Sequence, residues 1–199
     1  MAEHYYTQEP ESAHQERSFQ ATLLGETLAF TTDAGVFSKG GVDAGTRLLI
    51  EALPELEGRV LDLGCGWGPV GAALGKRYPG LEIVMTDINR RAVALAERNL
   101  EANGVKNARV VAGDGYESVE GRFSTIITNP PIRAGKQAIY GMFEQARDYL
   151  EAGGCLYIVI RKQQGAPSAL KFLEGLYGNA EVVDRGGGYW VIRAENREA

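Results

Sequence analysis

The sequence predicts an α/β fold, in which a doubly wound, mostly parallel sheet of seven strands is preceded by a small N-terminal β-hairpin. Two observations carry this prediction. From residue 59 onward, short apolar segments alternate with segments of helical spacing, which is typical of parallel strands with helices on both faces. The last two predicted strands have no helix between them and are joined through residues 186–188 (Gly-Gly-Gly), so the sheet should carry an antiparallel C-terminal strand.

The region ahead of the sheet divides into four parts. Residues 1–18 begin polar and acidic, and we expect them to be loosely ordered ahead of one domain at 19–199. Residues 19–30 alternate partly between apolar and polar side chains, with Gly25 at a turn position, and predict the hairpin. A stretch rich in Gly, Thr, Asp and Ser then predicts a loop. Helical spacing follows over residues 44–53.

The rest of the chain alternates strictly between strands and helices. The predicted strands are residues 59–63, 82–86, 108–112, 123–128, 155–161, 181–184 and 189–193, and the predicted helices are residues 69–78, 90–103, 136–150 and 168–176. Gly104 follows the second of these helices and the pair Gly153-Gly154 follows the third, and glycines commonly end helices.

The composition is ordinary for a globular protein, with 44% hydrophobic and 24% charged residues in a chain of 199. The apolar runs are strand-sized and too short to span a bilayer, and residues 1–16 lack the apolar core of a secretory signal. Cys65 and Cys155 lie in apolar contexts, so we expect a cytoplasmic protein without membrane association. His4 and His14 belong to the polar N-terminal segment, and we expect no metal site.

The formal net charge of −5 argues against an extended surface for nucleic acid, because phosphate binding usually requires basic side chains. A local basic patch can still exist on an acidic protein. Its candidates are Arg133, Lys136, Arg161 and Lys162. These four side chains are equally well explained as solvated surface charges.

A glycine-rich loop, residues 64–68 (Gly-Cys-Gly-Trp-Gly), follows the strand at Arg59–Leu63 and precedes a helix that begins at Pro69. Glycines there let the backbone turn sharply and approach a ligand, although a plain glycine-rich turn has the same composition. Residues 66–71 also match G-x-G-x-x-G, the dinucleotide fingerprint. Asp62 argues against that interpretation, because a carboxylate suits a cationic amino group better than a pyrophosphate.

The second and third predicted strands also lead into acidic residues. Asp87, which is followed by Ile88, is placed to accept hydrogen bonds from both hydroxyls of a ribose. An adenosine-containing methyl donor and NAD would both use this contact, so Asp87 does not distinguish them. Asp114 and Gly115 follow the third strand, where an isolated aspartate could simply belong to a turn.

A second specialised loop, residues 129–132 (Asn-Pro-Pro-Ile), follows the fourth predicted strand. Its prolines stiffen the backbone and remove amide donors, which leaves the Pro130 carbonyl and the Asn129 side-chain oxygen as acceptors. Two acceptors that hold both N–H bonds of a planar amino group would orient it and free its lone pair for a methyl carbon. The simpler interpretation is a strand breaker, since these residue types favour turns.

These motifs resemble those of the class I methyltransferases that depend on S-adenosylmethionine (AdoMet) and have a Rossmann-like fold. Residues 62–68 read D-x-G-x-G-x-G, the methyltransferase form of the glycine loop, and Asn-Pro-Pro occurs in enzymes that methylate planar amino groups. More closely, residues 19–193 resemble the small-subunit ribosomal RNA guanine-N2 methyltransferases of the RsmC type. The segments 30–38, 43–49, 129–136 and 161–166 share in this resemblance.

The resemblance implies AdoMet as cofactor and, as acceptor, the exocyclic N2 amino group of a guanine in ribosomal RNA. The partner would be ribosomal RNA or the small ribosomal subunit, and the protein a monomer or homodimer. The catalytic residues would be Asn129 and Pro130. The AdoMet-binding residues would be Asp62, Gly64, Gly66, Gly68, Asp87, Ile88, Asp114, Gly115 and Asn129, with Asp114 accepting from the adenine amino group. The substrate-binding residues would be Phe37, Ser38, Pro131, Ile132, Arg133, Lys136, Arg161 and Lys162.

The sequence departs from the family pattern in two ways. Some members carry a second, degenerate domain ahead of the catalytic one, and this chain is expected to correspond to the catalytic half alone. Ile132 follows the prolines, where many amino-methylating enzymes have an aromatic residue. Stacking on a base would then fall to Phe37 or Tyr140, although Phe37 could equally be a core anchor.

Two other functions stay open at this point. One keeps methyl transfer but changes the acceptor to a protein glutamine or a DNA adenine. The other is a NAD-type nucleotide-binding oxidoreductase or a non-catalytic AdoMet-binding module. Binding of NADH would favour the oxidoreductase, and AdoMet binding without transfer would favour the module.

Overall fold

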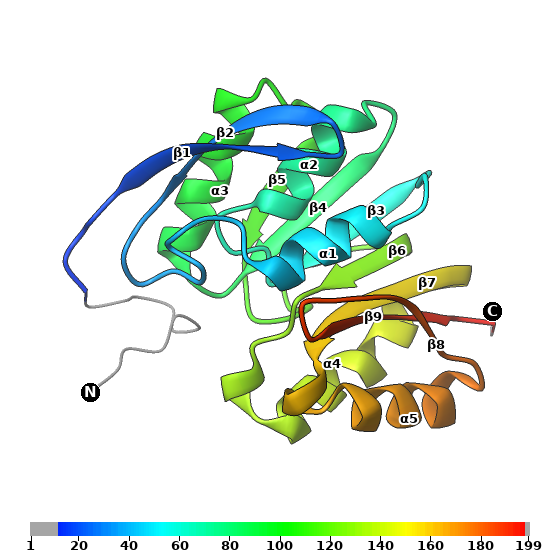
Figure 1. Cartoon of the computed structure of the whole chain (residues 1–199). Helices are drawn as coiled ribbons and strands as arrows, with labels where there is room; N and C mark the ends of the chain where they lie inside the picture. The colour runs from blue at the N-terminus through cyan, green and yellow to red at the C-terminus, as the bar shows by residue number, and fades with distance from the viewer. Residues whose placement is uncertain (1–11, 198–199) are drawn as a thin grey trace.

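The structure is a computed structural model that describes residues 12–197, with a seven-stranded sheet between two layers of helices (Figure 1). The N-terminal hairpin consists of β1 (Arg17–Leu23) and β2 (Glu26–Thr32). The strands of the sheet are β3 (Arg59–Leu63), β4 (Glu82–Asp87), β5 (Ala108–Ala112), β6 (Phe123–Thr128), β7 (Leu150–Arg161), β8 (Glu181–Gly186) and β9 (Tyr189–Glu195). The α-helices are α1 (Ala44–Ala52), α2 (Pro69–Arg77), α3 (Arg90–Ala102), α4 (Lys136–Tyr149) and α5 (Ala166–Tyr177).

The strand order is β5-β4-β3-β6-β7-β9-β8, and only β9 runs antiparallel to both of its neighbours. The four pairs among β3 to β7 are parallel. The predicted doubly wound sheet with its antiparallel strand is therefore confirmed. The chain builds outward from β3 toward β5 and then returns to add β6 on the other side. This reversal opens a crevice at the carboxyl ends of β3 and β6, where ligands bind in sheets of this type.

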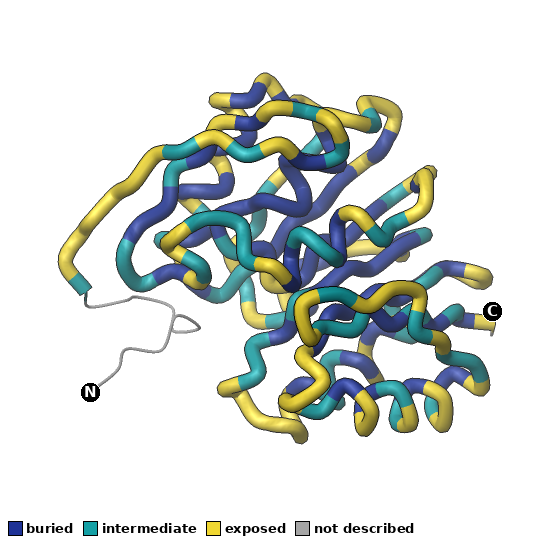
Figure 2. Tube along the Cα trace, viewed as in Figure 1, coloured by how far each residue is buried: buried dark blue, intermediate teal, exposed yellow. Residues whose placement is uncertain are grey.

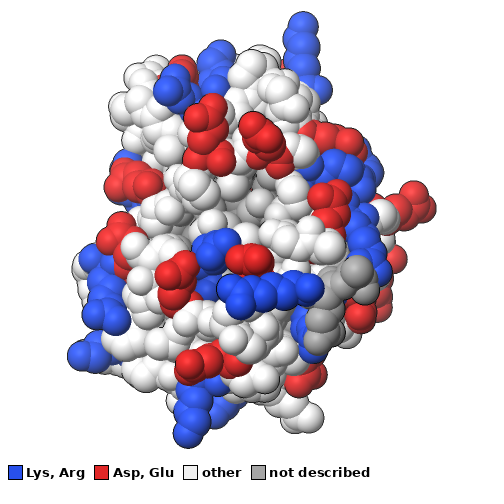
Figure 3. All heavy atoms as spheres, turned by 90° about the vertical axis from the view of Figure 1, so that its right-hand side faces the viewer, with Lys and Arg blue, Asp and Glu red and all other residues white. Residues whose placement is uncertain are grey.

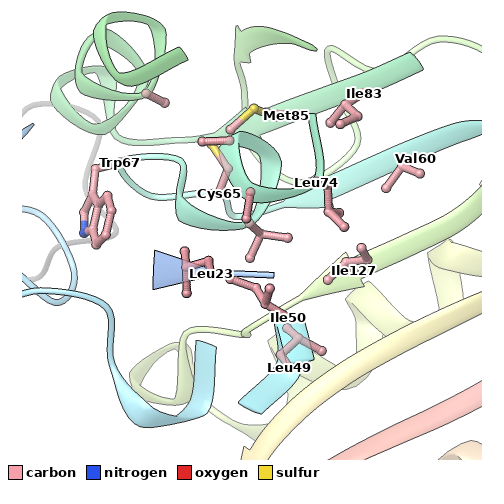
Figure 4. Packing of buried hydrophobic residues seen from close by; sticks show 14 of the residues in the cluster. Leu23, Leu49, Ile50, Val60, Cys65, Trp67, Leu74, Ile83, Met85 and Ile127 are labelled. Carbon is pink, nitrogen blue, oxygen red and sulfur yellow. The ribbon is translucent and has the colours of Figure 1, made fainter. Parts of the chain in front are cut away.

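Successive side chains of each strand point to opposite faces of the sheet and fill two separate cores. Val60 of β3 belongs to the core under α1, α2, α3 and the hairpin, while Leu61 and Leu63 belong to the core under α4 and α5. Figure 2 shows the buried chain concentrated along the strands and the inner helix faces. Figure 4 shows part of the first core, in which Leu23 of the hairpin, Ile50 of α1 and Ile127 of β6 come together.

The hairpin is joined to α3 by two asparagine side chains one helical turn apart. Asn99 accepts from the backbone N–H of Thr31 at 2.8 Å and donates to its carbonyl at 3.0 Å. Asn103 makes the same pair of bonds with Ala29, at 2.9 and 2.8 Å. The two amides thus pair with the edge of β2 as a neighbouring strand would.

The N-terminal boundary differs from the sequence prediction. The first strand begins at Arg17, inside the segment 1–18 that was expected to be loosely ordered, and residues 1–11 lie outside the described residues. Residues just before β1 are held by contacts: the backbone N–H of Gln15 donates to Asp33 at 2.5 Å, and Glu16 pairs with Arg98 at 2.6 Å. The division into an N-terminal segment and one domain stays a prediction.

Gly153 and Gly154, which were expected to end the helix predicted at residues 136–150, lie inside β7 instead. That helix, α4, ends at Tyr149 and β7 begins at the next residue, with a register shift against β6 between Phe123 and Thr125. Gly153 has φ +78° in this irregular stretch. A Cβ on Gly154 would lie 3.0 Å from the carbonyl oxygens of Glu151 and Phe123, so this close approach requires glycine.

Gly71 in α2 is a position where we expect an added methyl group to destabilise the fold. Its Cβ would lie 2.3 Å from Sδ of the buried Met85, and a well-packed core has no room for it. Gly71→Ala should lower the free energy of unfolding by about 1–3 kcal/mol, measured by urea denaturation.

Gly141 in α4 is the matched control, because a Cβ there would meet nothing within 4 Å. Gly141→Ala should raise stability by about 0.5–1 kcal/mol, since alanine favours a helix interior over glycine. Equal effects of the two substitutions would contradict the packing argument.

Candidate active site

A cavity of about 630 Å³ lies at the carboxyl edge of the sheet, a size typical of small-molecule sites. Of the residues predicted for the site, the cavity is lined by Phe37, Ser38, Asp62, Gly64, Gly66, Asp87, Ile88, Asp114, Gly115, Asn129, Pro130, Pro131, Ile132, Arg133 and Arg161. Gly68, Lys136 and Lys162 are not among the lining residues. Both specialised loops thus meet in one cavity.

The glycine-rich loop is held by the end of β4. The backbone N–H groups of Gly64 and Cys65 donate to the Thr86 carbonyl at 2.8 and 2.9 Å, and that of Gly66 donates to Asp87 Oδ2 at 2.7 Å. Gly64 has φ +74° and Gly66 φ +58°, conformations that favour glycine. A Cβ on either residue would meet nothing within 4 Å, so the loop leaves room for a ligand at its surface.

Gly68 has a packing role in the structure. It precedes α2 with φ +89°, and a Cβ would lie 3.1 Å from both the Ala96 and the Met85 side chains. The third glycine of the motif therefore lets α2 and its loop approach α3. The contact of Gly68 with the cofactor, which the motif resemblance implies, stays a prediction.

Two carboxyl groups lie beside the glycine-rich loop, that of the buried Asp62 and that of the half-buried Asp87. Burial raises the pKa of Asp62 to about 7, a hydrogen bond from the Gly71 N–H at 3.2 Å opposes the rise, and the charge of Asp87 adds to it. Burial also raises the pKa of Asp87, although backbone N–H groups, including that of Asn89 at 2.9 Å, oppose this. A cation near Asp62 would restore its charged form.

The Asn-Pro-Pro loop leaves β6 and closes into a short 3₁₀ turn, Ile132–Ala134. The Ala134 N–H donates to the Pro131 carbonyl at 2.8 Å, which fixes the loop locally. Asn129 is half-buried, and its side-chain Nδ2 donates to Thr46 Oγ1 of α1 at 3.0 Å. The amide is thereby anchored at the cavity wall.

The loop before α1 brings Phe37 and Ser38 to the cavity. The indole N–H of Trp67 donates to the Phe37 carbonyl at 3.0 Å, and the Trp67 ring is itself buried against Phe19 and Phe30. Ser38 has φ +54°, and its hydroxyl donates to the Gly41 carbonyl. Phe37 is 37% exposed and lines the cavity, so it is not a core anchor.

The aromatic and basic candidates divide between the cavity and its surroundings. Tyr140 stacks on Phe172 of α5 with ring centroids 4.0 Å apart and does not line the cavity, which leaves Phe37 as the candidate for stacking on a base. Arg161 lies over the ring of Tyr189 at 5.0 Å, and both line the cavity. On the face shown in Figure 3, basic and acidic side chains are mixed without one continuous patch of either sign.

Asp43, Thr46 and Tyr189 are among the cavity residues that the sequence analysis did not predict. Asp43 is the N-cap of α1, and an aspartate before a helical pattern is a recognisable cap signal. That signal predicts the helix start but not its position beside the cavity. Tyr189 packs against Gly45, where a Cβ would lie 2.7 Å from the Tyr189 ring, and no local pattern indicates this contact.

Residues 12–197 contain no group of three or more His, Cys, Asp or Glu side chains placed to hold a metal ion. No helix among these residues has the length and apolar character needed to cross a membrane.

Comparison with known proteins relates the chain to methyltransferases. The chain is 43% identical to an uncharacterised protein, YbxB, of Bacillus subtilis, over 98% of this chain and 99% of the relative. It is 37% identical to ribosomal RNA small subunit methyltransferase C of Vibrio vulnificus, over 89% of this chain and 52% of the relative. Among solved structures it matches the T. thermophilus 16S rRNA N2 G1207 methyltransferase in complex with AdoMet and guanosine, with TM-score 0.82, 31% identity and coverage of 92% and 51%.

The chain spans about half the length of the methyltransferase C relatives that it matches. The family of the methyltransferase small domain matches residues 27–193, which include both specialised loops and every strand from β3 to β8. The resemblance that the motifs indicate is confirmed, and the chain belongs to the methyltransferase small domain family.

Proposed function

We propose that this protein transfers the methyl group of AdoMet to the exocyclic N2 amino group of a guanine in small-subunit ribosomal RNA. The observation that carries the proposal is the meeting of the glycine-rich loop, the acidic strand ends and Asn129-Pro130 in one cavity. Relatives named as small-subunit ribosomal RNA methyltransferases, and a matched 16S rRNA N2 G1207 methyltransferase that holds AdoMet and guanosine, support it.

The part of the cavity formed by the glycine-rich loop and the acidic strand ends is called the donor side, because it would hold the methyl donor. Its hydrogen-bonding groups suit AdoMet. Asp87 keeps acceptor capacity for the ribose hydroxyls, because a carboxylate has about four lone-pair sites and backbone N–H groups use only part of them. Asp62 would attract the ammonium group, and Asp114 with Gly115 would contact the adenine beside Ile88. Gly64 and Gly66 have no side chain, so the ligand can approach their backbone closely. AdoMet supplies an electrophilic methyl group on a sulfonium centre.

The acceptor side fits a planar amino group. The Asn129 side-chain oxygen and the Pro130 carbonyl would accept the two N–H bonds of the guanine N2 and direct its lone pair toward the methyl carbon. Most of the rate acceleration would then come from positioning. Phe37 and Ile132 would contact the faces of the base, which must be unpaired or flipped out of its stack to enter. Arg133 and Arg161 at the cavity, with Lys136 and Lys162 farther out, would meet phosphates.

The substrate would be ribosomal RNA, either free or within the small ribosomal subunit, in the cytoplasm. An acidic chain with few basic residues at its cavity would depend on the folded shape of that substrate more than on general attraction to phosphate. The active species would be a monomer or a homodimer.

Asn129→Ala tests the function and the acceptor side together. The parent protein and the variant are incubated with methyl-labelled AdoMet and four acceptors: unmodified small subunits, naked ribosomal RNA, DNA and total protein. We expect label in ribosomal RNA, recovered as N2-methylguanine, and a loss of roughly 10²-fold or more in the variant because an acceptor of the amino group is gone. The affinity for AdoMet should stay near that of the parent.

Asn179→Ala is the control, since Asn179 is also half-buried but bonds Tyr177 and Glu195 away from the cavity. It should lower stability and leave turnover unchanged. Label in DNA or protein would replace the proposed acceptor with one of the alternative methyl acceptors. Bound AdoMet without label in any acceptor would favour a binding module, and bound NADH an oxidoreductase.

The affinity for AdoMet should depend on pH through Asp62. The carboxyl has a pKa of about 7 in the free protein, and a bound ammonium group would lower it. Below pH 7, binding then releases the proton of Asp62. The affinity for AdoMet therefore reaches its maximum near pH 7 and falls as the pH drops. The expected slope is at most about tenfold per pH unit. Calorimetry between about pH 5.5 and 7.5, in two buffers of different protonation enthalpy, measures both affinity and proton release.

Asp62→Asn provides the comparison. This variant should bind AdoMet more weakly at the upper end of the range and show no change in affinity as the pH falls. A parent affinity that is constant across the range would remove Asp62 from the ammonium contact while leaving the other donor-side contacts in place.

A further inference from the structure

Three polar side chains form a hydrogen-bonded row from the start of α1 to the Asn-Pro-Pro loop. Asn129 Nδ2 donates to Thr46 Oγ1 at 3.0 Å, and Thr46 Oγ1 donates to Asp43 Oδ2 at 2.5 Å. Thr46 is 5% exposed, and all three residues line the cavity. The row joins segments that are 83 residues apart in the sequence.

The carboxylate at the end of the row sets the direction of every bond in it. Asp43 only accepts: its Oδ1 receives the backbone N–H groups of Gly45 and Thr46, and its Oδ2 receives the Thr46 hydroxyl. A hydroxyl has one proton, so Thr46 Oγ1 can only accept from Asn129. The Asn129 amide must then turn its NH₂ toward Thr46 and its oxygen away. The oxygen and nitrogen of a side-chain amide have nearly the same size, so shape alone does not decide which way each of them points. Here the hydrogen bonds decide it.

We propose that Asp43 and Thr46 are positioning residues that fix the direction of the Asn129 amide, so that its oxygen faces the amino group to be methylated. The inference rests on the proposed function. A flipped amide would present N–H groups to the N–H groups of the substrate, which repel. The row would therefore also select an amino group over a carbonyl at the same place on a base. Neither residue needs to touch the substrate for this effect.

Asp43→Asn tests the direction of the bonds with little change in shape. Asparagine is as good an N-cap as aspartate, so α1 should persist. Its side-chain NH₂ can donate to Thr46 Oγ1, which frees the hydroxyl proton to point toward Asn129 and favours the flipped amide. Thr46→Val removes the hydroxyl, and Thr46→Ser keeps it.

The measurements are kcat and KM with unmodified small subunits or ribosomal RNA, the dissociation constant for AdoMet, and Tm. Asp43→Asn and Thr46→Val should lower kcat roughly 10- to 100-fold, as misplaced catalytic groups do. The affinity for AdoMet should stay within about twofold of the parent, because the donor side is unchanged. Thr46→Ser should recover most of the parent kcat.

Combination with Asn129→Ala separates positioning from a general structural effect. When the amide is absent, its direction cannot matter, so Thr46→Val should have no further effect on single-turnover rates in that background. A full additional loss would overturn the proposal in favour of a structural role for Thr46. If Thr46→Val does not fold, Asp43→Asn in the same two backgrounds decides the question.

Two further outcomes distinguish the positioning role from the proposed function on which it rests. If Asn129→Ala loses turnover while Asp43→Asn and Thr46→Val keep the parent kcat, the positioning role is wrong and the proposed function stands. If Asn129→Ala itself turns over at the parent rate, the catalytic role of the loop is wrong and the positioning role is overturned with it.

Discussion

The site depends on one set of hydrogen bonds, those by which the end of β4 holds the loop that follows β3. The Thr86 carbonyl accepts from Gly64 and Cys65, and Asp87 accepts from Gly66. These bonds cross between neighbouring parallel strands, so they exist only when the sheet has its correct register. They hold the loop in its left-handed turns and leave its surface open. Without them, the carboxyl edge would have no shaped cavity for the other loops to complete.

The empty cavity is an unfavourable environment for the charged forms of its acidic residues. Burial raises the pKa values of both Asp62 and Asp87, and the charge of Asp87 adds to the rise at Asp62. Part of the binding free energy of a cationic ligand would therefore go into restoring the charge of Asp62. The same arrangement discriminates against anionic ligands such as a pyrophosphate. A site that favours one sign of charge in this way gains selectivity at some cost in stability when empty.

The sequence predicted the features that follow from strand order, and it missed those that depend on tertiary contacts. Asp62, Asp87 and Asn129 could be placed together because parallel strands all end at one edge of the sheet. Thr46 could not, because nothing in its own segment shows that α1 packs beside the loop after β6. Gly68 matched a ligand-binding pattern, yet the constraint on it comes from Ala96 in another helix. Likewise, the partner of Tyr140 is Phe172, a residue whose position depends on how α4 and α5 pack together.

The asparagine pair of α3 has a consequence for behaviour in solution. A hairpin of two strands is marginal by itself, and each of its two edges carries backbone groups that could pair with another chain. Asn99 and Asn103 occupy those groups on Ala29 and Thr31 with side chains, which cannot extend into a further strand. The inner edge of the hairpin is thus closed to the edge-to-edge association that leads to aggregation. Two amides spaced by one helical turn protect this edge without an additional strand.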